Sequence, residues 1–339
     1  MVHHFAFNFA PVGFGTASGQ LLSIAQNTAL FSILGTTFGG NGQTTFALPN
    51  YGDRLSAASG QGAGLSFHSL GEIYGNDTIS LKVADMPSPL GGVGEQIQNV
   101  QPTLGMTYMI SPWGSSPAGS NGGASIVGSI WEFGGNFVPR DWLACDGGLV
   151  SISTYPDLFA LIGTTYGGDG VTTFAVPNLL GRTPIGASAG SGPVGTVFGA
   201  EASVVLGANL PANMGGTGTA IDNREPGLVI NYIIAIEGIF PSRNAPLIDL
   251  DPLAAAFNTA VYLGEIIAYA GTALPAGYAF AQGQLLSIAQ NTALFSLLGT
   301  TYGGNGTTTF ALPDLRGRAM VGASSSARSA PSPGRIAIC

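Results

Sequence analysis

The chain has 339 residues, a formal net charge of −8, and charged side chains at only 8% of its positions. A hydrophobic content of 45% excludes an intrinsically disordered chain, and an acidic balance without a Lys/Arg cluster argues against nucleic-acid binding. So little surface charge also removes one common barrier to association, so we expect an oligomer or a fibre.

Two cysteines, Cys145 and Cys339, are too few and too far apart for a disulfide framework or a metal site. Cys145 is expected to be a small buried residue, and Cys339 is either free or paired between chains. The N-terminus has no basic segment followed by an apolar core, and the longest apolar stretch, residues 228–240, is shorter than the ~20 residues of a membrane span. We therefore expect no secretory signal and no membrane insertion.

A segment of about thirty residues occurs three times and organises the chain. Residues 19–49 recur at 283–313 with three differences, and a looser copy occupies residues 147–177. The repeats predict three modules: module one over residues 1–125, module two over 126–245, a linker over 246–262, and module three over 263–339 with a truncated tail.

Each module is predicted to begin with a strand that ends at a proline, over residues 3–11, 129–139 and 265–275. A second short strand is expected at residues 142–145 and 278–281 of modules two and three. The loose alternation of residues 130–133 in the middle copy is typical of a partly buried strand.

A short helix is predicted next, beginning after Asn27 in module one and ending at Gly35. Ser23 offers a competing start one turn earlier, through a capping box with Gln26. The apolar residues at positions 30, 31 and 34 share one face, so we expect them in the core. The helix is too short to stand alone in water and must pack on the neighbouring strands.

A glycine loop follows each helix, at residues 39–42, 167–170 and 303–306. No lysine follows the last glycine and no GxGxxG opens onto a helix, so a phosphate site is not indicated. Asn or Asp between glycines favours a tight turn, here before a strand at residues 44–48. The arginines after that strand are expected to bind nearby carboxylates or carbonyls.

Modules one and two share a longer tail. Residues 65–72 are taken to correspond to 194–201, and residues 78–83 to 202–206. Glycine-rich loops at 91–99 and 215–223 lead to final strands at 104–110 and 228–236. Module three has only residues 335–338 for that last strand, which predicts an open sheet edge able to recruit a strand from another chain.

These motifs together resemble the phage tail collar domain and the bacterial proteins, described as microcystin-dependent, that carry it. The resemblance rests on Trp-x-x-Cys-Asp-Gly, the Gly-Thr-Thr-Tyr-Gly-Gly-Asp/Asn-Gly core, Thr-Thr-Phe-Ala-x-Pro and Asn-Tyr-Ile-Ile-Ala. It implies a β-rich α+β fold of three tandem modules, each with short strands and one short helix. It also implies trimeric tail-fibre and tail-tip proteins with a structural or host-attachment role.

One departure concerns metal. Members of that family often carry His-x-His after the Met-Pro that ends the middle strand, whereas this chain has Ser88-Pro89 there in module one and Ala212-Asn213 in module two. We expect no metal and no cofactor. His68 could contribute to a site only across a trimer, and a lone histidine beside an apolar strand is more often part of the packing.

Function is expected to be structural and adhesive, in a phage or phage-derived tail fibre, tail tip or extracellular fibre on a virion or extracellular particle. Loops on a rigid scaffold usually carry recognition. The predicted receptor-binding residues are Gly92, Gln96, Gln98, Asn99, Trp113, Asn213, Asp222 and Asn223.

The alternative is a carbohydrate-binding, lectin-like module in which Trp113 stacks on sugar, whereas Trp131 and Trp142 lie in expected strands and suit a core. Catalysis is not expected. Glu72 with Glu201, or Asp146 with Asp157, could form carboxylate pairs, but no nucleophile or metal-ligand spacing supports chemistry.

Expected partners are copies of this chain as a homotrimer or fibre, other tail or baseplate proteins, and a cell-surface glycan. We expect the modules to fold separately and to stack in tandem along a fibre. A pseudo-threefold ring within one chain is the alternative, and the unequal tails count against it.

Overall fold

The three opening strands meet at the centre of the molecule. A computed structural model describes residues 1–6, 10–11, 14–76, 78–113, 126–221, 223–238, 261–322 and 335–338. The opening strands are β1 (His4–Phe5), β10 (Ser129–Phe133) and β18 (Glu265–Tyr269). β18 pairs with both β1 and β10. An isolated bridge between Val2 and Glu132 joins β1 to β10, so that each of the three strands contacts the other two and they form a triangle.

The register of this triangle has threefold pseudo-symmetry. Aligning the repeats makes Val2, Ile130 and Ile266 equivalent to one another, and likewise His4, Glu132 and Ala268. Each residue of the first set faces one of the second: Val2 with Glu132, Ile130 with Ala268, and Ile266 with His4. The three modules are therefore arranged as a ring within one chain.

The last strand of each module completes the sheet of the next module. β9 (Thr103–Ile110) lies between parallel β4 (Leu55–Ala58) and antiparallel β10. β17 (Gly227–Ala235) lies in the same way between β14 (Thr183–Gly186) and β18. β23 (Arg335–Ile338) lies between β22 (Val321–Gly322) and β1, which returns the end of the chain to its beginning.

Three sequence expectations are wrong at this point. The modules do not stack in tandem, because their opening strands pair with one another. They do not form separate sheets, because β9 pairs with β10 and with β11 (Leu143–Ala144), while β17 pairs with β18 and with β19 (Tyr278–Phe280). Module three is not short of its last strand, because β23 fills that place and pairs with β1. The module boundaries stay a prediction, since residues 114–125 and 239–260 lie outside the described part.

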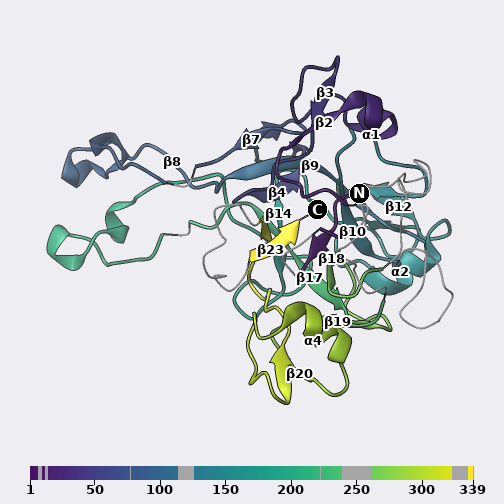
Figure 1. The fold of residues 1–339 in the computed structure, drawn as a ribbon. Helices are drawn as coiled ribbons and strands as arrows, with labels where there is room; N and C mark the ends of the chain where they lie inside the picture. The colour runs from purple at the N-terminus through teal and green to yellow at the C-terminus, as the bar shows by residue number, and fades with distance from the viewer. Residues whose placement is uncertain are drawn as a thin grey trace.

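Each module also carries a two-stranded ribbon that encloses its helix, and Figure 1 shows the three ribbons on different sides of the central sheet. The ribbons are β2 (Leu21–Ser23) with β3 (Thr45–Ala47), β12 (Leu149–Ser151) with β13 (Thr173–Ala175), and β20 (Leu285–Ser287) with β21 (Thr309–Ala311). The helices are α1 (Thr28–Leu34), α2 (Pro156–Ile162) and α4 (Thr292–Leu298).

The predicted helix boundaries are confirmed, although the capping contacts differ. Gly35 ends α1 with a φ of 54°, a conformation that favours glycine. Asn27 precedes α1, but its amide Nδ2 donates to the Ser23 carbonyl at 3.0 Å, and no side-chain cap bond forms. Ser23 instead precedes a short 3-10 turn, η1 (Ile24–Gln26).

The glycine loops are tight turns, as predicted. Asp169 Oδ1 accepts backbone N–H groups from the three residues Val171, Thr172 and Thr173, and Asn41 and Asn305 do the same in their modules. The arginines bind locally, as predicted. Arg316 donates twice to the Asp314 carboxylate at 2.9 Å. Backbone carbonyls accept from the others, and these contacts include Arg54 to Gly52, Arg182 to Leu180 and Arg318 to Asp314.

The core runs through all three modules, and the first helix is its exception. Leu158 and Leu294 are buried in the shared core, whereas the equivalent Leu30 is 37% exposed, so its predicted place in the core is wrong. Helix α1 packs through Leu34 into a smaller cluster of its own module. Cys145 is buried as expected, and burial raises the pKa of its thiol.

A buried polar cluster breaks the pseudo-symmetry at the ring. Glu132 accepts hydrogen bonds from Tyr51, from Tyr108 at 2.9 Å and from Ser56 at 3.0 Å, and it contacts His4 Nε2 at 3.1 Å. Burial opposes its ionisation, but His4 and the tyrosine hydroxyls outweigh burial and hold the pKa of Glu132 below its ordinary value.

Apart from Tyr232, which is equivalent to Tyr108, the repeats have apolar residues at most of the corresponding positions. These are Leu179 and Leu315 for Tyr51, Pro184 and Met320 for Ser56, and Ala268 for Glu132. A buried carboxylate that loses its polar partners is strongly destabilising, so an arrangement in which Glu132 did not reach the His4 side chain would be strongly disfavoured. The cluster therefore favours one order of the three modules around the ring, because only that order gives Glu132 its polar partners.

Candidate functional site: the paired arms

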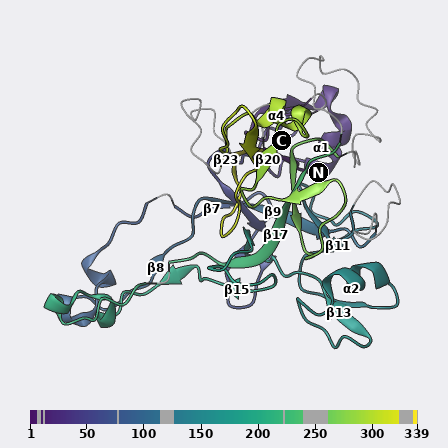
Figure 2. The ribbon, with the colours of Figure 1, turned by 90° about the horizontal axis from the view of Figure 1, so that it is seen from below.

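Two long arms project from the same side of the sheet and lie side by side in both views (Figures 1 and 2). We define arm 1 as residues 75–100 and arm 2 as residues 199–224. Arm 1 contains η2 (Val83–Asp85), η3 (Ser88–Leu90) and β8 (Ile97–Gln98). Arm 2 contains β16 (Ala202–Ser203), η4 (Gly207–Asn209) and η5 (Ala212–Met214).

The arms are equivalent elements of modules one and two. Gly75 and Gly199 open them with φ values of 83° and 79°, and a Cβ at either would lie 2.0 Å from a backbone carbonyl. Before each arm a two-residue strand pairs with the last strand of its module, β7 (Ile73–Tyr74) with β9 and β15 (Val197–Phe198) with β17. Ile73 lies opposite Leu104 in β9, and Val197 lies opposite the equivalent Leu228 in β17, so Ile73 and Val197 are equivalent. The predicted correspondence of residues 65–72 with 194–201 is therefore wrong.

The distal end of each arm folds back on itself. In arm 1 the N–H of Gly94 donates to the Met86 carbonyl at 3.0 Å, and in arm 2 Gly218 donates to Leu210 at 2.9 Å. A Cβ on Gly92 would lie 1.8 Å from the Met86 oxygen. The glycines of this loop therefore allow the close approach of two backbone segments.

One edge of each arm pairs with the other arm. β8 and β16 are antiparallel, with Gln98 opposite Ala202 and Ile97 opposite Ser203. Asn99 continues the contact: its N–H donates to the Glu201 carbonyl at 2.9 Å, and its amide contacts Ser203 Oγ at 3.3 Å. The two arms therefore form one ribbon that joins module one to module two.

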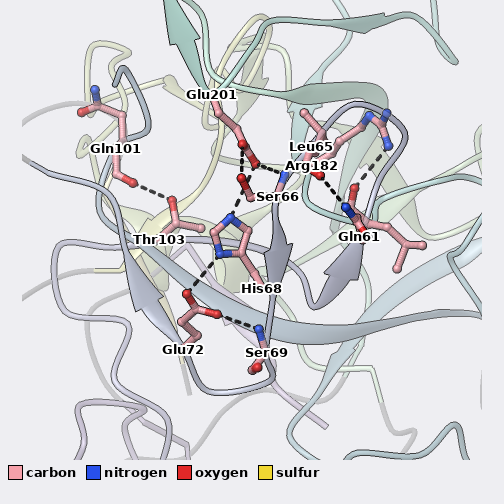
Figure 3. Close-up of polar contacts among 11 residues, drawn as sticks. Gln61, Leu65, Ser66, His68, Ser69, Glu72, Gln101, Thr103, Arg182 and Glu201 are labelled. Atoms are coloured by element: carbon pink, nitrogen blue, oxygen red, sulfur yellow. Dashed lines mark hydrogen bonds and ion pairs between the residues drawn. The ribbon is translucent and has the colours of Figure 1, made fainter. Parts of the chain in front are cut away.

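A charged cluster holds the arms together at their base (Figure 3). His68, in β6 (Phe67–His68), lies between two carboxylates. Its Nδ1 is 3.2 Å from Glu72 Oε1, and its Nε2 is 3.6 Å from Glu201 Oε1. Ser66 donates to Glu201 through both its N–H and its hydroxyl, at 2.8 and 2.6 Å. The imidazole stacks on Tyr74 with ring centroids 3.5 Å apart. β6 pairs with β5 (Gly60–Gln61), which anchors this hairpin.

A second carboxylate beside this cluster is set to bind a proton near neutral pH. Glu225 and Glu201 line the same small cavity, together with Tyr74 and Thr103. Burial raises the pKa of Glu225 to about 7, although the N–H of Gln101 donates to it at 3.2 Å. The same burial, with the three nearby glutamates, raises the pKa of Tyr74. Among the described residues, no group of three His, Cys, Asp or Glu side chains is arranged to hold a metal ion.

The predicted recognition residues fall into three groups. Gln96, Gln98, Asn213 and Asn223 are exposed on the arms, and Asp222 lies outside the described residues. Gly92 and Asn99 are buried within the arms, so they shape the ribbon rather than face a ligand. Trp113 lies away from the arms; it packs on Tyr155 at 5.3 Å and is 43% exposed.

The apolar side chains of the arms were missed by sequence reasoning. The exposed ones are Ile79, Leu81, Val83, Leu90, Val93, Leu206, Met214 and Ile221. Their signal was visible as isolated apolar residues in glycine-rich segments. The His68–Glu201 contact was also missed, because residues of two different modules form it. Trp131 is buried in the core, as expected, and Trp142 is partly buried and packs against the same cluster.

Similarity to a known protein family is found in the body of the molecule and not in the arms. The family model of the phage tail collar domain matches residues 1–56, 128–184 and 264–320, which confirms three tandem copies, while both arms lie outside these segments. No curated protein and no solved structure matches the chain. In the described part, no helix has the length and apolar character that crossing a membrane requires. The collar domain is a structural domain of phage tail fibres and so associates with the virion, and the three matches cover half of the sequence: the chain belongs to the phage tail collar domain family.

Proposed function

We propose that this chain is a structural and adhesive component of a phage or phage-derived tail fibre or tail tip, and that it attaches to a surface through the distal ends of its two arms. Its partners are then other tail or baseplate proteins on the body and a cell-surface glycan at the arms. It acts by binding and not by catalysis.

The observation that carries this proposal is the exposure of apolar and amide side chains at the ends of the projecting arms. Val93 is 78% exposed, Met214 51% and Leu90 40%, and Asn213 is exposed beside Met214. Contiguous apolar surface costs solubility and usually marks a binding site. Exposed amides beside it supply the hydrogen bonds that give a contact its specificity.

The body supplies what such a contact needs from a scaffold. The arms are joined along β8 and β16 and clamped at their base by His68 and Glu201, so their ends are held at a fixed spacing. A preorganised binding surface loses less conformational entropy on binding than a flexible one.

The test is binding of the labelled full chain to a panel of bacterial cells and to a glycan array. Val93→Ser in arm 1 should weaken binding by about tenfold, equal to about 1.4 kcal/mol. Val171→Ser is the matched control, because Val171 is equally exposed, at 81%, in the turn of module two. Gln96→Ala and Gln43→Ala form a second matched pair of exposed residues.

Equal binding by Val93→Ser, Gln96→Ala and the wild-type chain would contradict the proposal. Loss of glycan binding in Trp113→Ala, with the arm variants unaffected, would favour the lectin-like alternative. That alternative has one observation in its favour, the exposed tryptophan face next to Tyr155.

A further inference from the structure

The ring has three equivalent places for an arm, and the described residues fill two of them. Residues 59–102 connect β4 to β9 and residues 187–226 connect β14 to β17, and each connection includes an arm. Only residues 323–334 connect β22 to β23. With 12 residues against the 26 of each arm, and about 3.3 Å for each extended residue, this stretch of sequence is too short to supply a third hairpin of that length.

The pairing of the arms shows which edges the missing third arm would cover. The returning strand of arm 1, β8, pairs with the outgoing strand of arm 2, β16. Under the pseudo-symmetry the returning strand of arm 2 would pair with a third arm, and so would the outgoing strand of arm 1. Two edges therefore border the vacant place: residues 78–83 and the segment around Ile221.

Side-chain exposure supports this assignment at equivalent positions. On the outgoing strands, Leu81 of arm 1 is 59% exposed and Ile79 is 49% exposed, whereas the equivalent Val205 and Ser203 of arm 2 are half-buried.

The returning strands show the reverse pattern. Ile221 of arm 2 is 40% exposed and Asn223 is exposed, whereas in arm 1 the equivalent Ile97 is half-buried and Asn99 is 4% exposed. The exposed residues, Ile79 and Leu81 of arm 1 and Ile221 and Asn223 of arm 2, therefore all lie on the two edges that have no neighbouring arm among the described residues.

We propose that a second copy of this chain fills the vacant place with its own arms, so that two chains associate with their arms antiparallel. The vacant place accepts a hairpin with an outgoing and a returning strand, and each copy carries such hairpins. In a twofold dimer each pair of arms covers the open edges of the other pair, which makes the contact self-complementary. The contact continues the edge pairing that β8 and β16 already make.

The chemistry of the edges suits a partner of the same composition. Lys82 is the one charged residue between positions 78 and 83, and residues 202–221 carry no charged side chain. Charged side chains are the usual protection of exposed strand edges, and their scarcity here permits pairing. This inference goes beyond attachment to a surface, because it concerns the sides of the arms and not their distal ends.

The test is the molar mass of the full chain by sedimentation equilibrium across the micromolar range. The wild type should show a monomer–dimer equilibrium, and Leu81→Asp should raise the dimer dissociation constant at least about tenfold. Leu285→Asp is the matched control, since Leu285 is 61% exposed on β20, far from the arms in sequence. Val93→Ser, which tests surface attachment, should leave the dimer dissociation constant unchanged. Failure of dimerisation and failure of surface attachment can therefore be told apart.

Hydrogen exchange gives a second readout. Backbone amides of residues 78–83 should gain protection as the wild-type concentration rises, and Leu81→Asp should abolish that gain. A wild-type chain that stays monomeric throughout would overturn the proposal, as would a dimer equally weakened by Leu285→Asp. A monomer that instead captures a hairpin of another protein along residues 78–83 would also overturn it.

Discussion

At the scale of single residues, Glu225 makes the base of the arms sensitive to pH. Its pKa in the folded chain is about 7, against an ordinary value of 4.5, because the carboxyl is buried beside Glu201. Between these values the folded chain keeps a proton that the unfolded chain releases. Stability from this group is therefore fully present below about pH 4.5 and is lost as the pH rises through 7.

Glu225→Gln should remove this dependence. At about pH 8 the variant should be more stable than the wild type by up to about 3 kcal/mol, and at about pH 4.5 the two should differ little. Chemical denaturation at both pH values measures the difference, with Glu95→Gln on the exposed face of arm 1 as the control. A variant whose advantage is the same at both pH values would show that burial of this carboxylate does not set its pKa.

At the scale of elements, β23 determines whether the ring is closed. It is the only described segment between β22 and β1, and it makes a parallel and an antiparallel ladder with them. Deleting residues 335–339 should lower the free energy of unfolding by about 3 kcal/mol, at about 1 kcal/mol for each lost backbone hydrogen bond. It should leave the oligomeric state unchanged, since the vacant arm place lies elsewhere.

Removal of Cys339 alone is the control for the β23 deletion. Thermal unfolding followed by circular dichroism gives the comparison. If the longer deletion melted like the shorter one, β23 would have no part in closing the sheet. If it changed the molar mass instead, the open edge would recruit strands between chains.

Elements with local causes could be predicted from the sequence. The glycine that ends each helix and the Asn or Asp that ties each turn act within a few residues, so their patterns were sufficient. The pairing of β9 with β10 depends on two modules at once, and no local pattern specifies it. The base of the arms was missed for the same reason, since Glu72 and Glu201 meet only through His68.

At the scale of the whole molecule, the exchange of last strands makes the three modules one folding unit. β17 is buried along its whole length and pairs with β14, β15, β18 and β19, the last two from module three. β10 likewise depends on β9 from module one. An isolated module therefore exposes two long apolar edges, which favours aggregation over folding.

The fragment of residues 126–238 tests this directly. It contains the second collar match and arm 2, but it lacks β9, β18 and β19. We expect no cooperative thermal transition and poor chemical-shift dispersion in its NMR spectrum, whereas the full chain melts in one step. Addition of separately expressed residues 1–113 should restore only the β9 pairing and should leave β17 uncovered. A fragment that melts cooperatively within a few degrees of the full chain would mean that each collar module folds by itself, and that strand exchange adds association without being needed for folding.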